Sequence, residues 1–233
     1  MLKLKHFKRE VAIDQKTGEL NSVYFYKGKR CKSGVVQGPL ASQYIGYRLI
    51  AEDLREVEAW LKQAYALVPK IKTQPKKGED YYLLGSTRKD KNILIIKSLF
   101  FSSIIFYGKC FAGAEKGRRI KLERKHVPTD YHKVHDEIIG YRNNLAAHSG
   151  EGRWDTGELI WILEDEPGIP EGIRWYTELN RLHFKNDQRE EHNFLGLVQA
   201  VLKWVNQKFD TLQQKINSTP KKIIKGTNTG LSS

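Results

Sequence analysis

Apolar residues recur every three or four positions over long stretches of this chain, which is the spacing of one face of an α-helix. The first stretch predicts a helix over residues 39–68, because Pro39 suits a first helical position and Pro69 disfavours continuation. Its apolar stripe consists of Leu40, Tyr44, Tyr47, Ala51, Leu54, Val57, Leu61, Tyr65 and Val68. The last stretch predicts a helix over residues 190–216, with its inward positions at Phe194, Val198, Val201, Val205 and Leu212.

A second helix is predicted over residues 90–111, and it is apolar nearly all round. One stripe is Ile93, Ile96, Phe100, Ile104, Tyr107 and Phe111, and other faces carry Leu94, Leu99, Phe101 and Ile105. Such a helix is expected at the centre of a bundle. Its apolar run from Ile93 to Tyr107 is interrupted by Lys97 and is shorter than the ~20 residues of a membrane span. We therefore expect a buried helix and no membrane partner.

A third helix is predicted to start near Thr129 or Asp130, which are good N-cap residues directly after Pro128. Gly150 is a suitable stop. The inward stripe is Tyr131, Val134, Ile138, Tyr141 and Leu145. Three residues further, the same stripe reaches His148.

Two segments have β character instead. The runs Glu10–Ile13 and Leu20–Tyr26 flank a turn-rich sequence, and Glu158–Glu164 and Ile173–Leu179 flank a segment rich in proline and glycine. Each pair of runs predicts a β-hairpin.

The predicted fold is therefore mainly α, a bundle of about four main helices with peripheral β-hairpins. The helical domain is expected at 39–216, with a hairpin insertion at about 158–184. A basic hairpin and loop extension is expected at 1–38, and a flexible basic tail at 217–233.

Composition and charge restrict the class of function. The chain of 233 residues is 39% hydrophobic and 29% charged, which is typical of a globular protein and not of a disordered one. Its net charge of +13 favours a polyanionic partner, with nucleic acid first and an acidic membrane surface second. Two cysteines without metal-ligand spacing, and an N-terminus without a signal peptide, indicate a reduced, cytoplasmic protein.

The third helix carries the most informative chemistry. Arg142 and His148 stand six positions apart, with the polar Asn143 directly after the arginine. An arginine stabilises negative charge on phosphate, and a histidine moves protons near neutral pH. Six positions on a straight helix separate two side chains by about 120°. Convergence on one point therefore requires the long arginine stem, unwinding near Gly150, or a second copy of the helix.

This arrangement resembles the Arg-polar-x(3–5)-His signature of the HEPN superfamily, whose small α-helical domains are often ribonucleases in defence and toxin–antitoxin systems. A second segment, Tyr107-Gly-Lys-Cys-Phe111, precedes a basic run and is similar to a YxRCF…R segment of one HEPN-like group, with Lys109 in place of the arginine. The tyrosine that one HEPN toxin type carries two residues after the histidine is replaced here by Gly150, which argues against regulation by modification of that tyrosine.

The resemblance implies a metal-independent endoribonuclease without a cofactor, acting in bacterial defence or stress response. The ribose 2′-OH would attack the adjacent phosphorus and leave a 2′,3′-cyclic phosphate. His148 would be the general acid or base, Arg142 would stabilise the phosphorane oxygens, and Asn143 would orient groups by hydrogen bonds. The resemblance also implies a homodimer that pairs the 129–148 helices, and it suggests a protein antitoxin or regulator as a further partner.

The connector before the third helix is the candidate RNA phosphate contact. Its basic residues are Lys116, Arg118, Arg119, Lys121, Arg124 and Lys125. Such contacts set affinity and salt dependence rather than sequence choice. A solvated charged loop is the alternative interpretation of the same residues.

Alternatives remain for the motif as well. His148 could be a buried core histidine and Arg142 an ordinary surface arginine, in which case the chain would be a HEPN-like module that binds RNA, nucleotide or protein without cleavage. His132 and His135 lie three positions apart, but too few further ligands surround them for a predicted metal site.

Overall fold

The structure is a computed structural model that describes residues 6–13, 15, 17–18, 20–31, 33, 36–71, 90–113, 120–147, 156–163, 173–180, 184 and 187–218. Helices account for 69% of the described residues, so the predicted mainly α fold is confirmed. The chain divides into two compact units, Gln43–Gln214 and a smaller one made of Met1–Ser42 with Lys215–Ser233.

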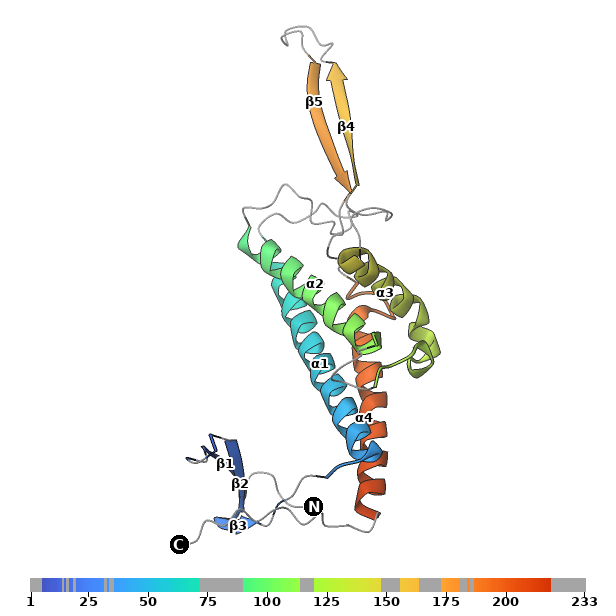
Figure 1. Ribbon diagram of the computed structural model, residues 1–233. Helices are drawn as coiled ribbons and strands as arrows, with labels where there is room; N and C mark the ends of the chain where they lie inside the picture. Colours follow the sequence, from blue (N-terminus) through green and yellow to red (C-terminus); the bar gives the residue numbers. More distant parts are fainter. Residues whose placement is uncertain are drawn as a thin grey trace. The chain divides into compact units, whose positions relative to one another are not determined.

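Four α-helices form the main part of the larger unit (Figure 1). They are α1 (Pro39–Leu67), α2 (Lys91–Phe111), α3 (His132–Ala147) and α4 (Phe194–Ser218). Ring contacts join them pairwise: Tyr44 of α1 and Phe209 of α4 lie 4.1 Å apart between ring centroids. Tyr107 of α2 meets Phe194 of α4 edge to face at 5.5 Å.

The predicted stripes largely form the core between these helices. All five inward positions predicted for α4 are buried, as are Ala51, Leu54, Val57, Leu61 and Tyr65 of α1. On α3 only Ile138 of the predicted stripe is fully buried, while Tyr131, Val134 and Tyr141 are half-buried and the side chain of Leu145 lies outside the described residues. The helical periodicity of apolar residues therefore identified the inner faces of α1 and α4.

The predicted place of α2 at the centre of the bundle holds for its inner face, but not for all of its other apolar positions. Its predicted stripe is buried from Ile93 to Tyr107, but Leu94 and Ile105 on the outer face are 49% and 48% exposed. By length and composition α2 could also cross a membrane, since it is a helix of 21 residues that contains a stretch of 18 residues with a mean hydropathy of 1.6. The apolar run from Ile93 to Tyr107 is shorter than a membrane span, but the whole helix is long enough for one. Among the described residues its inner face packs on the other helices, as in the core helix of a bundle.

Side-chain caps set the start of two helices. The Asp90 carboxylate accepts a hydrogen bond from the Asn92 amide at 2.8 Å, which places the start of α2 where it was predicted. The Asn193 side chain accepts from the Gly196 amide at 2.8 Å, so α4 starts at Phe194 and not at the predicted residue 190. The third helix opens with a 3-10 turn at Thr129–Tyr131 and becomes α-helical at His132. Its predicted stop, Gly150, lies outside the described residues.

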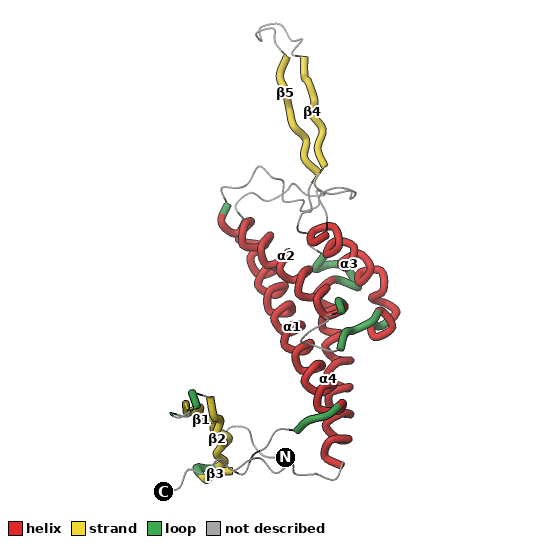
Figure 2. The backbone as a smooth tube through the Cα atoms, in the orientation of Figure 1, coloured by secondary structure: helices red, strands yellow, loops and turns green. Residues whose placement is uncertain are grey.

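The smaller unit contains an antiparallel sheet of three strands, β1 (Phe7–Ile13), β2 (Leu20–Tyr26) and β3 (Lys29–Cys31), drawn in yellow in Figure 2. The first two strands are the predicted hairpin. The third was not predicted, because its charged residues suggest a loop. A two-residue turn at Lys27 and Gly28, both with positive φ (50° and 76°), joins it to β2. A two-residue hairpin turn of this kind requires positive φ at both positions, and asparagine is commoner than lysine at the first of them.

The second predicted hairpin is confirmed as an antiparallel pair, β4 (Thr156–Leu163) and β5 (Ile173–Asn180). Its register places Trp161 opposite Trp175 and Thr156 opposite Asn180. β4 starts two residues earlier than the sequence pattern indicated, and β5 starts where it was predicted and ends one residue later.

Candidate functional site

Arg142 lies on α3 at the point where this helix contacts α2. Its aliphatic stem crosses the backbone of Gly108: a β-carbon built on that glycine would lie 2.6 Å from Cγ and 3.0 Å from Cδ of the arginine. The stem is therefore half-buried between the two helices. Gly108 belongs to the second segment that the sequence singled out, so the structure brings the two motif segments into contact.

The guanidinium group of Arg142 reaches the next residue. Its Nη1 donates a hydrogen bond to Oδ1 of Asn143 at 3.1 Å, and the Asn143 side chain is exposed. No carboxylate of the described part of the chain forms an ion pair with Arg142. A neutral amide leaves the full positive charge of the guanidinium, which is the property that phosphate recognition requires.

His148, the predicted general acid or base, lies outside the described residues. Of the three predicted catalytic residues, the structure therefore places Arg142 and Asn143, and it brings these two together through the hydrogen bond between their side chains.

A buried hydrogen bond joins Tyr107 of α2 to His135 of α3. The Tyr107 hydroxyl lies 2.8 Å from Nδ1 of His135, and the Phe111 ring packs on the imidazole with centroids 4.6 Å apart. Burial lowers the pKa of His135, against a smaller opposing effect of Asp136, so its ring is neutral at neutral pH. Burial also raises the pKa of Tyr107, which keeps its hydroxyl protonated. This pair serves the contact between the helices.

Neither histidine early in the third helix belongs to a metal site in the described part of the chain. Nε2 of His132 donates to the backbone oxygen of Val127 at 3.0 Å, while His135 is engaged with Tyr107. No group of three or more histidine, cysteine or acidic side chains suited to a metal ion is found among the described residues.

The predicted RNA-binding connector is described in its second half only, since Lys116, Arg118 and Arg119 lie outside the described residues. Arg124 forms a two-pronged pair with Asp136 of α3, with both distances 2.8 Å, and Lys125 pairs with Glu123 at 2.6 Å. Lys121 is exposed beside the same glutamate. Such exposed pairs are weak, so the basic side chains could exchange their carboxylates for phosphates.

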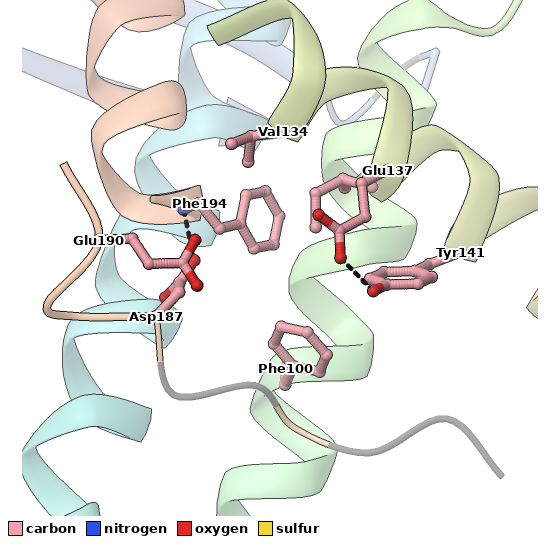
Figure 3. Close-up of a pocket in the computed structure, with 8 residues that line it drawn as sticks. Phe100, Val134, Glu137, Tyr141, Asp187, Glu190 and Phe194 are labelled. Carbon is pink, nitrogen blue, oxygen red and sulfur yellow. Dashed lines mark hydrogen bonds between the residues drawn. The ribbon is translucent and has the colours of Figure 1, made fainter. Parts of the chain in front are cut away.

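A small pocket near the motif helix was not predicted (Figure 3). It has a volume of about 20 Å³, enough for a water molecule but not for a base or a phosphate. Its lining residues are Phe100, Val134, Glu137, Ile138, Tyr141, Asp187, Glu190 and Phe194. On the α3 side, the Tyr141 hydroxyl donates to the Glu137 carboxylate.

Asp187 is the buried acid of this pocket. It accepts hydrogen bonds from the Tyr65 hydroxyl and from the Phe194 amide, the latter at 2.7 Å. Burial raises its pKa, while both hydrogen bonds oppose that effect. Asp187 thus ties the start of α4 to α1. An acidic residue a few positions before a helix was the only signal in the sequence, and many surface loops share it.

A scan of protein-family models, a search of curated proteins and a search of solved structures each found no match to this chain. The HEPN resemblance therefore rests on the sequence motifs of this chain alone.

Proposed function

We propose that this chain is a HEPN-type endoribonuclease that cleaves RNA without a metal ion. Its fold would be a HEPN-like version of the helical bundle, and its site would be built at the end of α3. The setting we propose is bacterial defence or stress response, in the cytoplasm, with RNA as the substrate. A protein antitoxin or regulator is the partner that such a setting implies.

One observation carries the proposal. The motif arginine is half-buried at its stem, is hydrogen-bonded at its head to a neutral amide and to no other described side chain, and is seated on the second HEPN-like segment. In contrast, the neighbouring Arg124 is held by the carboxylate of Asp136. A guanidinium whose stem is held and whose charge is not neutralised by a described carboxylate is suited to stabilise a phosphorane.

The proposed reaction follows from the chemistry of three residues. His148 would take the proton from the ribose 2′-OH or give one to the leaving 5′-oxygen, since the pKa of a histidine is near the working pH. Arg142 would bind the non-bridging oxygens as charge builds on them. Asn143, already paired with the arginine, would orient it or the substrate. Pairing of two α3 helices in a homodimer would supply the second motif.

The test is cleavage of a labelled, structured RNA in excess EDTA. We expect the parent protein to leave 2′,3′-cyclic phosphate ends, and Arg142→Ala and His148→Ala to lower the rate by at least ~100-fold. Arg189→Ala, at an exposed arginine outside the motif, is the matched control and should keep the parent rate.

Other results would point elsewhere. Salt-dependent RNA binding that is equal in all variants, without cleavage by any of them, would favour the non-catalytic binding module. Cleavage that survives His148→Ala but stops in EDTA would contradict the metal-free mechanism.

A further inference from the structure

Gly108 occupies an unfavourable position for a glycine. It lies in the last turns of α2, is buried, and has no left-handed backbone angle that would call for glycine. Glycine weakens a helix relative to alanine, because it loses more backbone freedom on folding. A glycine in this place therefore needs a reason outside its own helix.

The reason is the path of the Arg142 stem. A β-carbon at residue 108 would lie 2.6 Å from Cγ, 3.0 Å from Cδ and 3.2 Å from Cβ of Arg142. These are the inner atoms of the side chain, and they cannot move aside without a new rotamer. Any residue larger than glycine would thus force the arginine off its present course.

The other described helical glycines differ in what surrounds them. Gly140 lies on α3 itself, and a β-carbon built there meets nothing within 4 Å. Gly46 of α1 is also tightly packed, but against Ile120, with 2.4 Å to Cγ1. Among the glycines described within the helices, Gly108 contacts the motif arginine, Gly140 lies in open space, and Gly46 and Gly196 are tight against other side chains.

We infer that Gly108 is a positioning residue for catalysis, which sets the direction of the Arg142 guanidinium by letting its stem cross the α2 backbone. This inference rests on the proposed ribonuclease function. Gly108 fixes the stem and Asn143 holds the head at 3.1 Å, so the charge is held at two points. A displacement of about 1 Å of a catalytic group can cost on the order of 100-fold in rate.

The first experiment tests the contact without any need for activity. Thermal unfolding is measured for the parent, Gly108→Ala, Arg142→Ala and the double variant. We expect Gly108→Ala to lower Tm by about 2–10 °C in the parent, as overpacking does, and by much less when residue 142 is alanine. Gly140→Ala should not lower Tm. Equal losses in both backgrounds would overturn the inference, whatever the activity of the protein.

The second experiment measures cleavage kinetics in EDTA at a temperature where every variant is folded. Gly108→Ala should lower kcat by about 10- to 100-fold with little change in KM, because the arginine acts in the transition state. Gly46→Ala is the control for packing damage and should keep the parent kcat per folded molecule. A Gly108→Ala protein with the parent kcat would overturn the positioning role.

The two experiments separate the failure of the inference from that of the proposed function. Coupling in Tm with an inactive parent protein would overturn the ribonuclease function and with it any catalytic role of Gly108, while leaving the contact in place. Coupling with an active parent and a low kcat in Gly108→Ala would support both.

Discussion

The buried pair of Tyr107 and His135 should contribute measurably to stability. Tyr107 is fully buried and His135 is 5% exposed, and their polar atoms lie 2.8 Å apart at the contact between α2 and α3. Whichever ring nitrogen carries the hydrogen, the Tyr107→Phe change leaves Nδ1 of the histidine without this partner. An unpaired buried polar group costs about 1–3 kcal/mol. For a chain of this size, that corresponds to a fall in Tm of about 2–12 °C.

The assay is thermal and urea unfolding of Tyr107→Phe, His135→Phe and the double variant. The double variant should lose less than the sum of the single ones, because no orphan polar atom remains. Tyr44→Phe is the matched control: this tyrosine is half-buried, and its hydroxyl forms no hydrogen bond with the described residues. A Tyr107→Phe protein within about 0.5 kcal/mol of the parent, the usual range of surface changes, would refute the reasoning.

Two further predictions concern stability. Burial lowers the pKa of His135 in the folded state, so the unfolded chain binds more protons as the pH falls. The contribution of the buried neutral ring to the free energy of unfolding is therefore complete above about pH 6.5 and is lost as the pH falls below that value. Urea unfolding at pH 7.5 and 5.5 should show this loss, and the loss should be smaller in His135→Phe; an equal loss in that variant would contradict the assignment. His126, whose pKa burial also lowers, should contribute to the loss that remains. Asn193→Ala should cost about 1 kcal/mol, because it removes the cap on the Gly196 amide, and an unchanged urea midpoint would speak against that cap.

The candidate site shows how far residue types alone can lead. Arg142 and Asn143 were identified because their chemistry suits phosphate and because their spacing to His148 resembles a known signature. Their partner Gly108 was not identified as a functional residue. A glycine in an apolar helix has many explanations, and only the crossing of α2 and α3 shows that a side chain passes over it.

Errors at element boundaries have a similar origin. The last helix was predicted to start at residue 190, but the side chain that accepts a hydrogen bond from its first turn belongs to Asn193. The third strand of the small sheet was missed because Lys29 and Arg30 are charged, while the turn at Lys27 and Gly28 determines its pairing. In both cases the local geometry of a cap or a turn determined the boundary of the element, against the average structural preferences of the residue types involved.

By itself, the sequence determined the mainly α class, the approximate limits of α1, α2 and α4, the approximate start of α3, and the inner faces of α1 and α4. Those features depend on local periodicity, since a residue's neighbours at three and four positions are fixed once a helix forms. Only the tertiary structure decided that Tyr107 pairs with His135, that Asp187 holds the start of α4 against α1, and that Gly108 carries the stem of Arg142. These contacts join residues far apart along the chain, and no local pattern specifies which helix faces will meet.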